Sequence, residues 1–174
     1  HPMSAERLAT VRQRAQTYPP RERALQEARF LERTASLRAL TPAIRLFNKA
    51  EQARAHGDFA AGVRLAREGL TLAPHDYAGL LILAACQNSL NQPDAALATA
   101  QRAAMANPRE PNAQGMIAVT ALALGRYDEA LAATTAFEQV LPSEPQARFI
   151  RGFCHERLGH TAAAATAYRA YLQA

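Results

Sequence analysis

The chain has 174 residues, of which 49% are hydrophobic, and it carries a formal net charge of +5. This length favours a single domain, and a hydrophobic share made up largely of alanine suits tightly packed helices. There is no run of about 18 apolar residues, so the sequence predicts no membrane-spanning helix.

The first 42 residues are predicted to form an N-terminal helical arm. Residues 4–16 fit a helix capped by their serine, and the Tyr-Pro-Pro at residues 18–20 ends it. A second helix is expected over residues 21–38. Thr41 then caps the helix that follows, with Pro42 as its first helical residue.

Most of the positive charge lies in this arm. Residues 1–42 hold eight arginines and four acidic residues, whereas residues 43–174 hold twelve basic and eleven acidic ones. Basic arms can bind nucleic acid or anionic lipid. Here the arginines alternate with glutamates around the helices, which is the pattern of a solvated helical surface. No nucleic-acid partner is therefore predicted.

A 34-residue period organises the rest of the chain. Prolines recur at this interval, at Pro74, Pro108 and Pro142. Seventeen residues before each proline, and again near the C-terminus, lies a residue that tolerates left-handed backbone: Gly57, Asn91, Gly125 and Gly159. A fixed period of this length is typical of a repeat protein built from helix–turn–helix units.

Each period is predicted to hold one helix before the Gly or Asn turn and one after it, and the proline ends the pair. One pair cannot bury its own apolar stripe, so neighbouring pairs must stack. Small residues that let the paired helices approach closely recur in step, at Ala50, Ala84, Ala118 and Gly152 and at Gly62, Ala96, Ala130 and Ala164. The predicted fold is all-α, a right-handed helical solenoid of four units: 43–76, 77–110, 111–144 and 145–174.

This register resembles the tetratricopeptide repeat (TPR) family, most closely at residues 57–59 and 73–76. The resemblance covers about three quarters of the chain and implies a non-catalytic protein-interaction module without a cofactor. One departure is the large aromatic residue expected early in each first helix. Its places hold Leu46, Leu80, Gln114 and Arg148.

No catalytic or metal site is predicted. Zinc peptidase helices carry two histidines four residues apart, so that both share one face. His155 and His160 are five apart, about 140° around a helix, and a predicted turn separates them. Cys86 and Cys154 lie two repeats apart, too far for a disulfide, and are predicted to be buried packing thiols.

The resemblance also implies where a partner binds, because TPR proteins line a concave groove mainly with their first helices. The strip transferred to this chain, called here the predicted groove, comprises Phe47, Glu51, Arg54, Leu81, Ala85, Asn88, Gly115, Val119, Leu122, Phe149, Phe153 and Glu156. It is largely apolar and lacks the Lys/Asn/Arg ring with which chaperone-binding TPR proteins hold a C-terminal carboxylate. The expected ligand is an extended hydrophobic segment or a partner helix. Alternatively, the arm or a domain outside this sequence covers the strip.

The start of the arm carries a second resemblance. Residues 1–8 resemble the His-Pro-x-Ser/Thr-x-x-Arg segment that closes the catalytic domain of bacterial zinc metallopeptidases of the HtpX and BepA kind, some of which carry a TPR tail. The resemblance implies a periplasmic or envelope protein whose zinc lies only in an upstream domain. It also implies that the tail contacts substrates, the peptidase domain or outer-membrane assembly proteins.

Two alternatives stay open at the two ends of the sequence. The chain can instead be a free-standing TPR adaptor or secretion chaperone, cytoplasmic in that case, and residues 1–3 can be a vector remnant. At the other end, the last predicted helix has apolar faces and no polar capping helix after it, although solenoids need such a cap. Either the natural chain continues, or this end meets a partner or a second copy.

Overall fold

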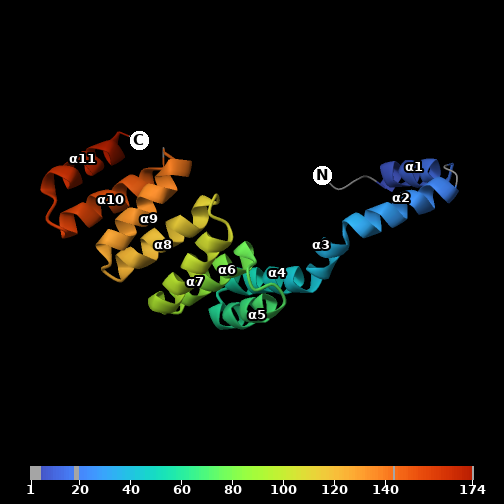
Figure 1. The fold of residues 1–174 in the computed structure, drawn as a ribbon, viewed down its shortest axis with the longest axis horizontal. Coiled ribbons are helices and arrows are strands. Elements are labelled where there is room, and N and C mark those ends of the chain that lie inside the picture. Colours follow the sequence, from blue (N-terminus) through green and yellow to red (C-terminus); the bar gives the residue numbers. More distant parts are fainter. Residues whose placement is uncertain (1–4, 18–19, 143, 174) are drawn as a thin grey trace. The chain divides into compact units, whose positions relative to one another are not determined.

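The computed structural model describes residues 5–17, 20–142 and 144–173, and every regular element within these ranges is a helix (Figure 1). The predicted all-helical class is therefore confirmed. Contacts divide the chain into two compact units, His1–Thr41 and Pro42–Ala174. None of the described helices is both long enough and apolar enough to cross a membrane.

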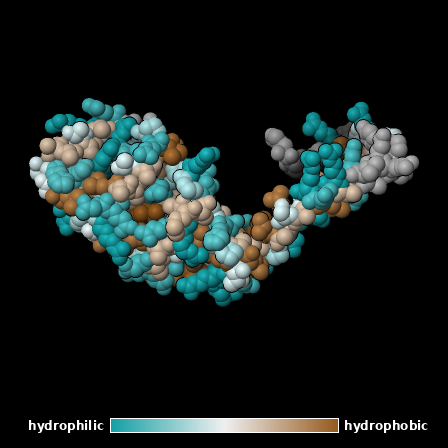
Figure 2. Space-filling model, viewed as in Figure 1, coloured by the Kyte–Doolittle hydropathy of each residue, from teal (hydrophilic) through white to brown (hydrophobic). Residues whose placement is uncertain are grey.

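The described part of the N-terminal unit consists of α1 (Ala5–Gln16), α2 (Pro20–Arg33) and α3 (Ala35–Ala39). The predicted serine cap at residue 4 and most of the predicted break, at residues 18–19, lie outside the described residues. Large apolar side chains reach the surface along α2 and α3 (Figure 2), with Phe30 63% and Leu37 64% exposed.

The prediction of one helix over residues 21–38 was wrong, because Thr34 divides this segment. Its backbone angles, φ −102° and ψ 3°, are not helical. The Thr34 hydroxyl donates a hydrogen bond to the carbonyl of Phe30 at 2.6 Å, and the Thr34 amide donates to the same carbonyl at 3.0 Å. Across the break, the Arg38 guanidinium donates to the carbonyl of Leu31 at 2.5 Å.

The C-terminal unit contains the predicted four pairs of helices, stacked in chain order (Figure 1). Their bounds are α4 (Thr41–Ala55), α5 (Phe59–Leu72), α6 (Tyr77–Ser89), α7 (Pro93–Ala106), α8 (Pro111–Ala123), α9 (Tyr127–Val140), α10 (Pro145–Arg157) and α11 (Thr161–Leu172). Helix α4 begins at Thr41, so Pro42 is its second residue rather than its first.

The turn within each pair has the predicted left-handed residue. The φ angles are 81° at Gly57, 56° at Asn91, 70° at Gly125 and 77° at Gly159. This conformation lets the next amide bond back to the end of the first helix, as where Asp58 N donates to the carbonyl of Ala53 at 2.9 Å. Glycine or asparagine therefore recurs once per repeat because each turn needs a residue with a positive φ angle.

Small residues allow the helices to pack closely. The first helices bury Ala50, Ala84 and Ala118, which are at most 2% exposed. At Gly62 an added Cβ would lie 2.6 Å from Cys86 Sγ, so even alanine would require the Cys86 side chain or the backbone to shift. The interior of the stack therefore depends on the absence of side-chain volume at these positions.

The first helices of successive repeats lie on the inner side of the stack. Helix α8 contacts both α6 and α10, the first helices on either side of it. Among the described residues, the second helices α7, α9 and α11 do not contact one another. Because helices lie closer on the inner side of a curved stack, the first helices line its concave face.

Candidate functional site

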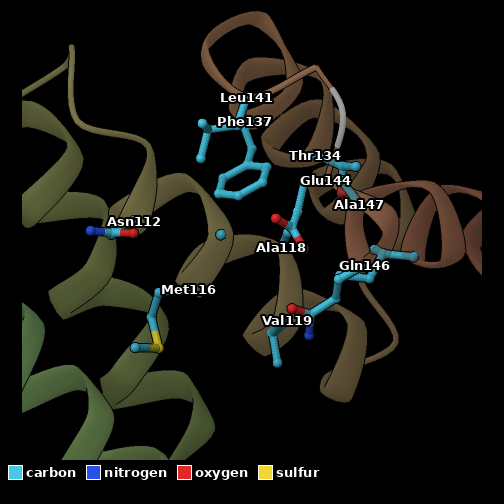
Figure 3. Close-up of a pocket in the computed structure, with 12 residues that line it drawn as sticks. Asn112, Met116, Ala118, Val119, Thr134, Phe137, Leu141, Glu144, Gln146 and Ala147 are labelled. Carbon is cyan, nitrogen blue, oxygen red and sulfur yellow. The ribbon is translucent and has the colours of Figure 1, made fainter. Parts of the chain in front are cut away.

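An apolar hollow of about 520 Å³ lies between α8, the end of α9 and the start of α10 (Figure 3). Its apolar walls include Gly115, Val119, Phe137, Leu141, Ala147 and Ile150. Glu144, Asn112 and Gln146 add polar groups. An apolar concavity of this volume with a few polar groups is the usual form of a ligand site.

A glycine on α8 leaves this space open. Gly115 stands two repeat periods after Phe47. In the first repeat the Phe47 ring lies over Gly69 and Gly79, where an added Cβ would collide with it. In the third repeat the ring comes from α9 instead, and a Cβ at Gly115 would lie 3.2 Å from Phe137. The Phe137 ring therefore covers the glycine but leaves the hollow beside it.

The first-repeat residues of the predicted groove are not free to hold a ligand. Phe47 is only 4% exposed, so it belongs to the core, and its place in the groove is a wrong prediction. Gly69 and Gly79 have no side chains, so the Phe47 ring fits against both of them in the core. Arg54 Nε donates to Glu51 Oε2 at 2.8 Å. This bond lowers the pKa of Glu51 and raises that of Arg54.

The second-repeat residues lie at the junction of two first helices. Leu81 and Ala85 are half-buried, and Leu81 packs against the core. The Asn88 side-chain amide donates to Thr120 Oγ1 at 2.8 Å and contacts Met116 Sδ at 3.3 Å. Asn88 therefore joins α6 to α8 and fixes the spacing of the concave face.

The third repeat brings two groove residues into the hollow. Gly115 and Val119 both line it, and Val119 is 43% exposed. Leu122 is half-buried and packs against the core one turn further along α8. The accessible part of the predicted groove in this repeat is therefore the part that faces the hollow.

The fourth repeat presents aromatic rings. Phe149 is 43% exposed, and its ring centroid lies 5.6 Å from that of Tyr171. Phe153 is half-buried on the same helix. Glu156 accepts a hydrogen bond from the Tyr168 hydroxyl at 2.7 Å, which raises the pKa of Tyr168 to about 12. Glu156 is thus engaged within the repeat, whereas Phe149 faces solvent.

Sequence reasoning missed Glu144, the carboxylate at the hollow. Its counterpart two repeats earlier, Asp76, caps its helix by accepting from Gly79 N at 2.8 Å. Glu144 makes no such cap, and its side chain extends towards α8 (Figure 3). One turn along α10, Arg148 donates instead to the carbonyl of Ala170 at 3.0 Å. The sequence could have indicated this residue, because Glu144 is a carboxylate two repeat periods after the capping residue Asp76.

The two residue pairs considered for metal or disulfide chemistry lie as follows. His155 and His160 sit on either side of the last turn, with their Nδ1 atoms 3.4 Å apart. Among the described residues, no three His, Cys, Asp or Glu form a metal-binding group. Cys86 and Cys154 are free and buried, as predicted, and burial raises the pKa of both thiols.

Comparison with known proteins places the repeats in a family. Two family models described as Tetratricopeptide repeat match residues 53–120 and 116–174. Among solved structures, a crystal structure of MamA has a TM-score of 0.73 at 18% identity, covering 75% of this chain and 77% of that one. MamA MSR-1 has a TM-score of 0.68 at 20% identity, covering 74% of each chain.

A third structure has the same fold from another source. TTC0263, a thermophilic TPR protein in Thermus thermophilus, has a TM-score of 0.61 at 22% identity and covers 75% of this chain and 73% of that one. No curated protein matches the chain. At these identities the structural likeness establishes the fold alone.

Proposed function

Since the chain is a tetratricopeptide repeat protein, we propose that it acts as a non-catalytic interaction module whose first helices hold an extended apolar segment of a partner protein. TPR domains act by binding proteins, which supports the general role. The observation that carries the specific site is the apolar hollow on the concave face, next to the exposed side chain of Val119. Extended peptides commonly gain specificity by placing side chains in such pockets.

The proposed surface extends from the hollow to the last repeat. Val119 and Phe149 are each 43% exposed on neighbouring first helices, α8 and α10. Exposed apolar side chains next to a concavity are typical of interaction surfaces. Neither side chain belongs to the buried core, although the Phe149 ring also packs against Tyr171.

The test is peptide binding by the purified chain, measured by fluorescence anisotropy with a panel of labelled apolar peptides. Val119→Asp and Phe149→Asp are expected to abolish binding, because each places a charge on the proposed contact surface. Met105→Asp is the matched control, since Met105 is 73% exposed on the second helix α7. Binding that survives both first-helix substitutions would contradict the proposal.

We further propose, from the residue 1–8 resemblance alone, that the chain is the tail of a periplasmic zinc metallopeptidase. The family models match residues 53–174, downstream of that segment, and lend this role no support. The test is the coding sequence before His1. An upstream frame of about 200 codons with His-Glu-x-x-His is expected. A start codon at Met3 would instead make the chain a free-standing adaptor or secretion chaperone.

A further inference from the structure

We infer that the hollow binds an aromatic side chain of the partner, and that a Lys or Arg beside this side chain pairs with Glu144. The inference rests on the proposed function, because it names the chemistry of the segment that the first helices hold. Two independent observations support it. An aromatic ring, that of Phe47, fills the equivalent space in the first repeat. The Glu144 carboxylate at the edge of the hollow makes no side-chain cap bond.

The first repeat provides an internal template for the occupant. The hollow lies among α8, α9 and α10, and the equivalent space two repeats earlier lies among α4, α5 and α6. That space is filled by the ring of Phe47, which is 4% exposed. In the third repeat the Phe137 ring takes the place of the Phe47 ring, and the hollow of about 520 Å³ lies beside it. Apolar walls in this register therefore already pack one aromatic ring, and a second ring, supplied by a partner, can pack against Phe137 in the hollow.

The hollow is open enough for such a ring to enter. The Phe137 ring covers Gly115 from the α9 side, yet about 520 Å³ remains, with Val119 43% and Leu141 42% exposed at its walls. Sites of this size bury most of a bound group. Contact with apolar walls stabilises an aromatic side chain by removing its large apolar surface from water.

The carboxylate of Glu144 adds a charge requirement. Within the described part of the chain, no hydrogen bond or ion pair engages this carboxylate, and it is half-buried beside apolar walls. The two nearby arginines of α10 are occupied. Arg148 donates to the carbonyls of Ala170 and Pro142, and Arg151 pairs with Glu138 at 2.8 Å. A cation from the partner completes the site, because charge-assisted hydrogen bonds are stronger than neutral ones.

The first experiment selects peptides from a random twelve-residue displayed library on the immobilised chain. Enriched peptides are expected to share Phe, Tyr or Trp with Lys or Arg within a few residues. Synthetic peptides with the aromatic residue replaced by alanine should bind at least about tenfold more weakly, which corresponds to about 1.4 kcal/mol. Enriched peptides without this pair would overturn the inference. If they still required Val119, they would leave the proposed function standing.

The second experiment tests the charge through Glu144. Glu144→Gln should weaken binding of the selected peptides by about tenfold. Glu144→Arg should shift selection towards peptides with Asp or Glu beside the aromatic residue. Glu110→Gln is the matched control, because Glu110 holds the same position before α8 and does not line the hollow. Equal effects of the two Gln substitutions would overturn the role of Glu144.

The third experiment closes the hollow from within. The triple substitution Gly115→Phe/Phe137→Gly/Ala147→Gly recreates the first-repeat arrangement of Phe47, Gly69 and Gly79, so it should abolish binding while keeping the helical circular dichroism spectrum. If this variant fails to fold, Val119→Lys at the exposed wall serves in its place and should repel the basic peptides. Retained binding by a folded closed variant would overturn the inference. Failure to enrich any peptide on the wild-type chain would overturn the proposed function as well.

Discussion

In the first repeat the ring of Phe47 comes from the first helix and lies over Gly69 and Gly79, whereas in the third repeat the ring of Phe137 comes from the second helix and covers Gly115. The same backbone frame surrounds both rings. The first arrangement leaves a closed core, and the second leaves an open concavity on the inner side. Which helix supplies the ring therefore distinguishes the closed first repeat from the third repeat with its open hollow.

The fourth repeat supports this interpretation because it has an aromatic residue at both positions. Phe149 and Tyr171 occupy the registers of Gly115 and Phe137. Their ring centroids are 5.6 Å apart, and the two residues are 43% and 40% exposed. In this repeat the two rings pack against each other and both stay partly exposed.

The largest effect expected from this comparison is the loss of the closed ring. Phe47→Ala should lower the free energy of unfolding by about 3–5 kcal/mol, because it removes a buried ring and leaves a cavity between three helices. Urea unfolding followed by circular dichroism measures the change. The control is Phe149→Ala, which should cost less than half as much because that ring is already 43% exposed. Equal costs would show that the two positions do not differ in packing.

Alanine substitution of the glycines should give the next largest contrast. Gly79→Ala should destabilise the chain by about 1–3 kcal/mol, because the added Cβ would collide with the Phe47 ring. Gly115→Ala should stay within about 1 kcal/mol of wild type. Its Cβ would lie 3.2 Å from Phe137, beside the hollow, and the higher helix propensity of alanine offsets the contact. Similar costs at both glycines would remove the distinction between a closed and an open repeat.

Much of the fold could be predicted from the sequence because the repeat depends on backbone conformation. A left-handed turn tolerates few residues, so Gly57, Asn91, Gly125 and Gly159 mark every pair in the linear sequence. The arm was harder to predict. The break falls at Thr34, whose hydroxyl bonds to the Phe30 carbonyl, yet Thr134 and Thr166 make the same kind of bond inside unbroken helices.

The site was only partly predictable because it depends on residues far apart in the chain. The family register places Gly115 and Val119 in the predicted groove, and in the structure both lie on α8 and line the hollow. The same register also placed Phe47 in the groove, since it takes no account of glycines in other helices. Pairing Phe47 with Gly69 would have identified it as a core residue. The carboxylate at the cap register marks Glu144 in the sequence, but no local pattern predicts that its side chain makes no cap and extends towards α8 (Figure 3).

The smallest effect expected concerns the aromatic residue that packs over a glycine in the last repeat. A Cβ at Gly152 would lie 2.6 Å from the Tyr168 ring, and the Tyr168 hydroxyl donates to Glu156. This bond raises the pKa of Tyr168 to about 12, above the ordinary value of about 10. Because the folded chain holds this proton more tightly, the stabilisation is complete below about pH 10 and is lost as the pH rises to about 12.

Absorbance at 295 nm during an alkaline titration should therefore show Tyr168 ionising about two pH units late. Burial raises the pKa of Tyr77 as well, so the signal of Tyr168 is the part of the late absorbance that Tyr168→Phe removes and Tyr171→Phe keeps. Wild type should also lose more stability than Tyr168→Phe between about pH 10 and pH 12. If Tyr168 instead ionised near its ordinary value, its hydroxyl would not be held by Glu156. The last repeat would then join its helices through ring packing and the bond from Arg148 to the Ala170 carbonyl.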